Sequence, residues 1–337
     1  MTPTVSITVT NYNGKHHLKE YFDSLFKQTR IPDEIFMYDN GSTDGSVDFV
    51  KKNFPGVRII SKVDVNTGPA VGQNIVFEKT IGKYVIIQAN DLRLDKNCVN
   101  ELVKTLNDNH EVGLCTSAAL SYQKKKELGI NEIEAAGGKL DVYGFSWPMY
   151  HGQKLQSIPK YGEIFCAYGN SFIIRREIFK KLSGFDEAYF ALNDDIDLSW
   201  RVRLLGYSVV YNARSIVYHK SHATLGSRYS GAQMRYWSER NSLRTVLKNY
   251  SLWLLVRYLP GTILLLMAES GWCLWHRRPK RTLALLTAIG WNILHFPDTL
   301  AKRKQIQSLR KVNDDVLLAK MYGGSFKWDH RNWPKEW

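Results

Sequence analysis

Short apolar runs alternate with helical patterns of hydrophobic residues through the first part of the chain. The runs are rich in Val and Ile, which is typical of buried strands, and residues such as Leu18, Phe22 and Leu25 recur at helical spacing. Expected strands are Val5–Val9, Glu34–Tyr38, Val57–Ser61, Val85–Ala89 and Val112–Ser117, and expected helices are Lys15–Lys27, Ser46–Asn53, Gln73–Thr80 and Asn97–Asn107. This alternation predicts an α/β fold with a mostly parallel sheet and helices on both faces.

Polar side chains follow four of these strands. They are Asn11, Asp39, Asn66 and the pair Asn90-Asp91. Taken alone, each of these residues could equally well be a helix cap. Ligands of open α/β sheets bind at the carboxyl ends of strands, so four such positions favour a shared ligand. Asp and Asn can contact a base and a ribose, and Asp91 can hold a divalent cation on a diphosphate.

A glycine-rich turn from Asn66 to Gly72 completes this expected edge. Gly68 and Gly72 would let the backbone approach a ligand closely. The chain has neither a Walker-type lysine loop nor a GxGxxG sequence. A P-loop nucleoside triphosphatase or a dinucleotide enzyme is therefore not supported.

Residues 118–165 are less regular, because glycines and Pro148 interrupt every long pattern. This segment is either an ordinary structured insertion or, through aromatic residues such as Trp147, one wall of an acceptor pocket. Further on, Asp194, Asp195 and Asp197 open a helix. Acids in a first turn suit the helix dipole. Three within four residues also repel one another, which raises the pKa of one member and favours a general base.

These motifs together resemble the family 2 inverting glycosyltransferases of the GT-A fold, in the branch described as rhamnosyltransferase-like. The resemblance covers about residues 4–250, and the order and spacing of the motifs make it specific. The matching segments are TNYNG at 10–14, DNGSTDGS at 39–46, NTGPAVGQN at 66–74, QAND at 88–91, GFDEAYF at 184–190 and NDDIDLSWR at 193–201, followed by His219 and Arg240-Asn241. We therefore expect a GT-A domain over residues 1–250.

The resemblance implies a nucleotide-sugar donor site. Its expected residues are Thr10, Asn11, Tyr12, Asp39, Asn66, Gly68, Asn74, Asn90 and Asp91. Asp91 matches the last acid of the DxD motif that binds Mg²⁺ or Mn²⁺, and His219 matches a further metal ligand. Ala89 replaces the first acid of that motif, which leaves Asp91 as its sole carboxylate.

The resemblance also implies a catalytic side. Asp195 matches the base that takes a proton from the acceptor hydroxyl, with Asp194 in place of the usual Glu before it. We expect Asp194, Trp200, Arg201 and Trp147 to contact the acceptor. Positive charge for the departing diphosphate is expected from the cation and from Arg228 or Arg235.

Basic charge is concentrated near the C-terminus. The chain carries a net charge of +14, and the block from His219 to Lys311 holds 16 Lys and Arg against three acids. Within it lie two apolar stretches, Leu252–Ala268 and Thr282–Pro297, separated by the basic linker Arg277–Arg281.

Neither stretch is a clean spanning segment, because the first is interrupted by Arg257 and Pro260. Basic side chains beside Trp-bearing apolar helices suit an anionic membrane surface. We therefore expect residues 251–337 to form a membrane-association region that attaches peripherally or monotopically. A soluble helical domain or an oligomer interface is the alternative.

Cysteine usage bears on the compartment. Cys98, Cys115, Cys166 and Cys273 show no metal or redox spacing, which indicates a reducing environment. The N-terminus reads as a first strand and not as a signal peptide. The expected location is the cytoplasmic face of the plasma membrane.

The leading hypothesis is a transferase that moves a sugar from a nucleotide donor to a lipid-linked saccharide in cell-surface glycan synthesis. One alternative is a polyprenyl-phosphate sugar synthase, whose phosphate acceptor needs little deprotonation. Another is a non-catalytic glycan- or lipid-binding scaffold, which Ala89 favours. Nucleic acid is a weaker partner for the basic charge, because the basic block is also strongly apolar.

Overall fold

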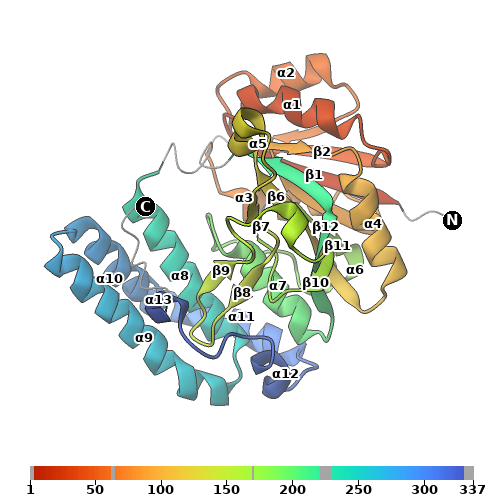
Figure 1. Ribbon diagram of the computed structural model, residues 1–337. Helices are drawn as coiled ribbons and strands as arrows, with labels where there is room; N and C mark the ends of the chain where they lie inside the picture. Colours follow the sequence, from red (N-terminus) through yellow and green to blue (C-terminus); the bar gives the residue numbers. More distant parts are fainter. Residues whose placement is uncertain (1–3, 62–64, 169–170, 221–228, 330–337) are drawn as a thin grey trace.

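The computed structural model describes residues 4–61, 65–168, 171–220 and 229–329. Its centre is a mixed sheet flanked by helices (Figure 1). The strands are β1 Val5–Asn11, β2 Glu34–Asp39, β3 Arg58–Ser61, β4 Tyr84–Ala89, β5 Leu92–Leu94, β6 Val112–Ser121, β7 Ile133–Ala135, β8 Gly138–Leu140, β9 Ser146–Pro148, β10 Tyr161–Glu163, β11 Ser171–Arg175 and β12 Ser208–His219. The main path of the sheet runs β10-β12-β6-β11-β4-β1-β2-β3.

The first half of the sheet is parallel, as the alternating pattern predicted. Strands β4, β1, β2 and β3 pair in parallel, and β6 pairs in parallel with β12. Strand β11 is antiparallel to both β4 and β6, and it lies between them. The α/β fold class is confirmed, with this antiparallel insertion as an added feature.

The helices are α1 Lys15–Leu25, α2 Ser46–Asn53, α3 Pro69–Phe77, α4 Cys98–Asp108, α5 Tyr122–Leu128, α6 Arg176–Lys181, α7 Asp194–Leu204, α8 Gly231–Asn249, α9 Leu252–Trp275, α10 Pro279–Leu294, α11 Phe296–Ser308, α12 Asp314–Leu318 and α13 Phe326–Asp329. Alternate residues of a strand point to opposite faces. Ile86 of β4 packs with residues of α1 and α4, whereas Val85 and Ile87 pack with residues of α3, α6 and α7. The mostly apolar sequence of β4 is therefore explained by burial on both faces.

The C-terminal helices form a separate layer beside the sheet, and α9 and α10 pack against each other at its outer edge (Figure 1). Arg257 and Pro260, which interrupt the apolar run in the sequence, do not end the helix, because α9 continues through both to Trp275. By length and composition alone, α9 could cross a membrane.

Buried ion pairs connect this layer to the sheet domain. Asp186, which follows α6, pairs with Arg244 at 2.8 Å and with Lys248 at 2.5 Å, both on α8. Lys248 also reaches Asp197 of α7 at 3.0 Å. Burial opposes ionisation of Asp186, but Lys248 and Arg244 outweigh it and hold the pKa of that carboxyl well below its usual range.

Candidate active site

Side-chain hydrogen bonds join the carboxyl ends of three neighbouring strands. Asn11 of β1 donates to Asp39 of β2 at 3.1 Å, and Asn90 after β4 donates to Asn11 at 2.7 Å. The next residue after β2, Asn40, donates to Asn66 at 2.7 Å, which places the glycine-rich turn at the same edge. The structure therefore brings together the strand-end residues predicted from the sequence. Their contact with a donor stays a prediction.

At this edge, the backbone of the glycine-rich turn lies very close to the backbone of another segment. Gly68 adopts φ +85° and ψ 165°, and a Cβ there would lie 2.2 Å from the carbonyl oxygen of Phe190. The donor-site turn therefore lies directly against the segment that leads to Asp194. Asn74 strengthens this junction, because its amide donates to the carbonyl of Phe185 at 3.0 Å. This hydrogen bond gives Asn74 a structural role beside its predicted place in the donor pocket.

Thr10 and Tyr12, the remaining predicted donor residues, are half-buried around the end of β1. They stay candidates for the nucleoside.

Asp91 and His219 lie face to face at the end of β4. His219 Nε2 is 3.6 Å from Asp91 Oδ2, and His219 Nδ1 is 2.7 Å from Glu134 Oε2. Burial opposes the imidazolium charge, but the hydrogen bonds to Asp91 and Glu134 outweigh burial and raise the pKa of His219 to about 10. Burial also opposes the charge of Asp91 and alone would raise its pKa, yet the hydrogen bond from His219 lowers that pKa.

Glu134 and His17 complete this cluster, and sequence reasoning missed both. Glu134 lies on the short strand β7, within the segment that looked irregular. His17 of α1 is buried, and its Nε2 has no hydrogen-bond partner among the described residues. Burial, followed by the neighbouring His16, lowers the pKa of His17 to about 4. Neither residue lies in a sequence motif with Asp91 or His219, because only the folded chain brings these side chains together.

The acidic helix start is α7, as expected, but its acids differ in role. Loss of solvent contact, with a smaller effect of Asp197, raises the pKa of Asp194 to about 6. Repulsion from Asp197 thus contributes less than burial to the raised pKa of Asp194. Asp197 is not available for catalysis, because it is buried and pairs with Arg201 at 2.8 Å and with Lys248.

Asp195, the predicted base, is buried beside the segment Cys166–Tyr168. Burial and then the charge of Asp195 raise the pKa of the Cys166 thiol and of the Tyr168 hydroxyl. Gly138 donates to the carbonyl of Cys166 at 2.8 Å. Because Glu134 precedes Gly138 by four residues, one short segment links the surroundings of His219 to those of Asp195.

Two predicted acceptor residues are wrong. Trp200 is 0% exposed and packs edge-on against Phe165 and Tyr250, so it belongs to the core between α7 and α8. Arg201 is buried and donates to the carbonyls of Leu182 and Gly184, besides its pair with Asp197. Helical periodicity explains the error: both follow the acidic motif in sequence but face inward.

One of the two predicted diphosphate arginines, Arg235, is paired with carboxylates of the C-terminal helices. Arg235 lies on α8 and pairs with Glu239 at 3.1 Å and with Glu269 of α9, so its charge is neutralised by two carboxylates. That assignment is a correction. Arg228 lies outside the described residues. Trp147 of β9 is about one-third exposed, and its acceptor role stays a prediction.

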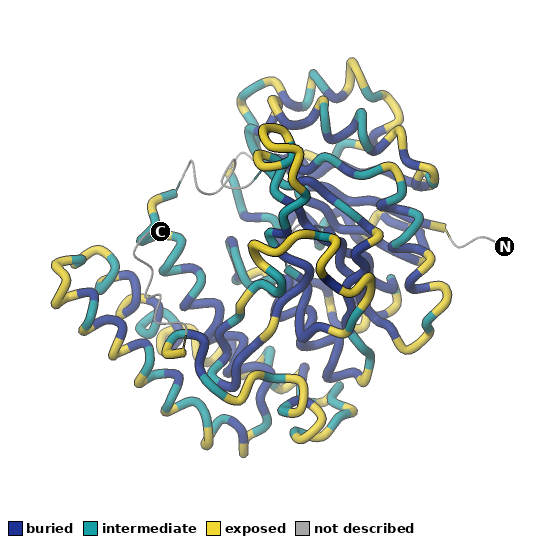
Figure 2. The backbone as a smooth tube through the Cα atoms, viewed as in Figure 1, coloured by how far each residue is buried: buried dark blue, intermediate teal, exposed yellow. Residues whose placement is uncertain are grey.

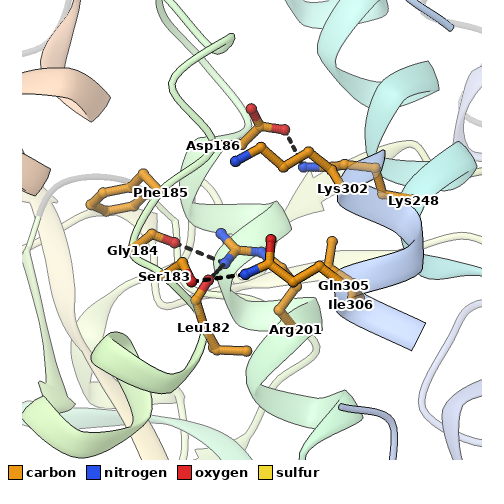
Figure 3. A pocket seen from close by; sticks show the side chains of 10 residues that line it. All are labelled: Leu182, Ser183, Gly184, Phe185, Asp186, Arg201, Lys248, Lys302, Gln305 and Ile306. Atoms are coloured by element: carbon orange, nitrogen blue, oxygen red, sulfur yellow. Dashed lines mark hydrogen bonds and ion pairs between the residues drawn. The ribbon is translucent and has the colours of Figure 1, made fainter. Parts of the chain in front are cut away.

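A small cavity lies between the turn Leu182–Asp186 and α11 (Figure 3). Most of its polar groups already have partners: Arg201 bonds backbone carbonyls, Lys248 bonds Asp186, and Gln305 bonds Ser183. None of the predicted donor residues lines it. We therefore assign this cavity to the junction between the sheet domain and the C-terminal layer.

The described residues contain no group of three or more His, Cys, Asp or Glu side chains arranged to hold a metal. Two predicted ligands do fit a divalent cation in kind. A carboxylate and an imidazole nitrogen face each other, and the far imidazole nitrogen bonds a second carboxylate, as metal-binding histidines usually do.

The chain is similar in sequence to two rhamnosyltransferases. The N-acetylglucosaminyl-diphospho-decaprenol L-rhamnosyltransferase of Mycobacterium tuberculosis is 24% identical over 243 residues, which are 66% of this chain and 78% of the relative. An O-antigen chain rhamnosyltransferase of Salmonella typhimurium is 26% identical over 225 residues, which are 65% of this chain and 67% of the relative.

A mannosyltransferase from Pyrobaculum calidifontis, solved with GDP-Man and Mn²⁺, shares the fold at a TM-score of 0.55 and 16% identity, over 92% of this chain and 86% of that one. The family profile "Glycosyl transferase family 2" matches residues 6–183, more than half of the sequence. The chain therefore belongs to glycosyl transferase family 2.

Proposed function

We propose that this enzyme transfers a sugar from a nucleoside-diphosphate donor to a hydroxyl of a lipid-linked saccharide, with inversion, in cell-surface glycan synthesis. The observation that carries the proposal is the pairing of Asp91 with His219 at the end of β4, joined through one segment to Asp195. The two rhamnosyltransferase relatives support a deoxysugar donor and a lipid-linked acceptor.

The strand-end network would hold the nucleoside. Asp39 accepts from Asn11 and from the backbone N–H of Ser42, so its carboxylate is fixed before a ligand arrives. A preorganised carboxylate can select a base by its hydrogen-bond donors without a further ordering cost. Thr10 and Tyr12 flank Asn11, which bonds this carboxylate, and they would complete the nucleoside contacts.

Asp91 and His219 are the residues that would hold Mg²⁺ or Mn²⁺. When bound, the cation supplies positive charge to the departing nucleoside diphosphate. Two protein ligands leave positions for phosphate oxygens and water, which is usual for hard cations on nucleotides. His219 would have to give up a proton, so cation binding should strengthen as pH rises.

Asp195 would take the proton from the acceptor hydroxyl as the hydroxyl attacks the sugar. It lies in the first turn of α7, between Asp194 and Ile196. Attack from the side opposite the diphosphate is a single displacement and needs no covalent nucleophile. Asp194, half-buried beside it, would border the acceptor.

We place the reaction at the cytoplasmic face of the plasma membrane. All four cysteines are free and buried, which suits a reducing compartment. Oligomeric state does not enter the proposal.

The test is a donor screen with the purified full-length enzyme. Nucleoside-diphosphate sugars, rhamnosyl donors included, are offered with a lipid-linked N-acetylglucosaminyl acceptor, and both nucleotide release and glycosylated lipid are measured. Metal-dependent transfer to the saccharide supports the proposal. Transfer only to polyprenyl phosphate would replace it with the phosphate-acceptor reaction. Donor binding without turnover on any acceptor would favour a scaffold.

A further inference from the structure

The outer side of the C-terminal layer is unusually apolar. More than half of the large hydrophobic side chains that are exposed in the described chain lie between residues 252 and 300. On α9 and α10 they are Leu252, Trp253, Val256, Leu264, Met267, Leu274, Trp275, Leu283, Leu286, Ile293 and Leu294. We call this set the apolar face. Figure 2 shows exposed residues recurring along both helices at the edge of the molecule.

Helical spacing makes the apolar face a stripe on α9. Trp253, Val256, Leu264, Met267 and Trp275 follow one another at intervals of whole turns, so they share one side of the helix. A patch of this extent is uncommon on a soluble monomer and marks an interaction surface.

Charge identifies the partner. Between residues 252 and 297 the sole acid is Glu269, which is buried, whereas Arg257, Arg277 and Lys280 are exposed. The exposed charges on α9, on α10 and on the linker between them are thus all basic, and the next exposed acid along the chain, Asp298 of α11, is paired with Arg244. A second copy of the chain would bring like charges together, while an anionic lipid surface complements them and admits the Trp side chains.

The opposite side of α9 decides how the helix meets the membrane. Glu269 pairs with Arg235 of α8 and, at 2.6 Å, with Lys327 of α13. Thr262 donates to the carbonyl of Tyr143 at 2.9 Å. Crossing a bilayer would require breaking these buried contacts, because every side of a spanning helix leaves the protein body.

We propose that the apolar face of α9 and α10 lies flat in the surface of an anionic membrane, with α9 parallel to the bilayer and not across it. The basic linker between the helices contacts lipid headgroups. This surface would hold the enzyme beside a lipid-linked acceptor. The binding measurement uses no donor or acceptor, so failure of the proposed transfer reaction would leave it unaffected.

The first experiment is flotation of the full-length protein with phosphatidylcholine vesicles, with or without phosphatidylglycerol. We expect binding only with the anionic lipid, weakened by salt. Leu264→Glu should reduce partition about tenfold or more, since Leu264 is 68% exposed on the stripe. Arg277→Gln combined with Lys280→Gln should reduce it about 25-fold, at roughly fivefold per charge.

The control is Ile81→Glu, because Ile81 is 76% exposed but precedes β4 in the sheet domain. It should bind vesicles as the wild type does. Equal binding by Leu264→Glu, or a dimer in solution that Leu264→Glu dissociates while vesicles are ignored, would overturn the proposal.

The second experiment distinguishes α9 lying flat on the membrane from α9 crossing the bilayer. Because all four native cysteines are buried, His276→Cys introduces one reactive thiol in the exposed linker. With protein added to preformed vesicles, a membrane-impermeant maleimide should label it fully. Protection that detergent abolishes would show that α9 crosses the bilayer and would refute the flat orientation.

Discussion

Glu134 holds His219 through a hydrogen bond of 2.7 Å between Glu134 Oε2 and His219 Nδ1. The opposite nitrogen, Nε2, is thereby aimed at Asp91. Carboxylates in this position orient metal-binding imidazoles, and losing them commonly costs 10–100-fold in metal affinity. Glu134 is thus a positioning residue for the proposed cation site.

We expect Glu134→Ala to weaken Mn²⁺ binding about tenfold or more, measured by titration without donor or acceptor. Glu134→Gln should retain most of the affinity, because its amide oxygen still accepts from Nδ1. Glu132→Ala is the control, since Glu132 pairs with Lys124 near the surface. Wild-type affinity in Glu134→Ala would show that His219 needs no such support or binds no metal.

Asp195→Asn tests the base. Loss of a general base typically slows the chemical step about 10²–10⁴-fold. We expect kcat to fall within that range while donor affinity, measured by calorimetry, stays near that of the wild type. Asp194→Asn should cost less, because Asp194 is assigned to the acceptor border. Equal turnover by wild type and Asp195→Asn would remove Asp195 from the reaction and favour a phosphate acceptor.

Gly68→Ala tests the junction between the donor turn and the segment before α7. The backbone of Gly68 lies in a region almost confined to glycine, which costs other residues about 1–3 kcal/mol, and a Cβ would also clash with Phe190. We expect greater loss of unfolding free energy than in Gly129→Ala, together with weaker donor binding.

Gly129 is the matched control, because its φ is also positive, at +68°, but nothing lies within 4 Å of an added Cβ. Its substitution should cost about 1–2 kcal/mol and leave donor binding unchanged. Urea denaturation and donor calorimetry on both variants check this. Equal losses in both variants would mean that the contact with Phe190 is unimportant.

Local sequence pattern was sufficient for strands β1 to β4 and β6 and for the polar residues at the strand ends, but it did not predict β12, which pairs in parallel with β6. Val85 to Ala89 is mostly apolar because both sides are covered, and Asn90-Asp91 is polar because the strand ends there. The antiparallel insertion of β11 was not predictable in this way, since strand order depends on long-range pairing. Short strands such as β7 also lack any reliable periodicity.

The residues of the candidate site also divide into those that the sequence pattern predicts and those that only the folded structure brings in. Asp91, His219 and Asp195 lie in recognisable motifs, whereas Glu134 and His17 join them only in three dimensions. Burial is the second reason for error. A helix motif gives no direct sign of which side faces the core, and Trp200 and Arg201 turned inward. Arg235 was misassigned because its carboxylate partner Glu269 lies on another helix.

Acid stability should depend on Asp186. Its pKa in the folded chain is well below the value near 3.9 expected when unfolded, because Lys248 and Arg244 outweigh the effect of burial. A depressed folded pKa stabilises the fold above the unfolded pKa, and that stabilisation is lost as pH falls below about 4. Asp186→Asn should therefore lower the unfolding free energy at neutral pH by about 1.5–3 kcal/mol, the cost of losing charged hydrogen bonds, because Lys248 keeps its pair with Asp197 and Arg244 keeps its pair with Asp298.

The gap between wild type and Asp186→Asn should narrow as pH falls from about 5 towards 2, because the wild-type carboxyl loses its advantage over that range. Urea unfolding at a series of pH values measures the gap. Asp23→Asn is the control, since Asp23 forms an exposed pair with Lys19 and should shift stability by less than about 1 kcal/mol. A constant gap across the range would mean that the charge of Asp186 is not what fastens α8 to the sheet domain.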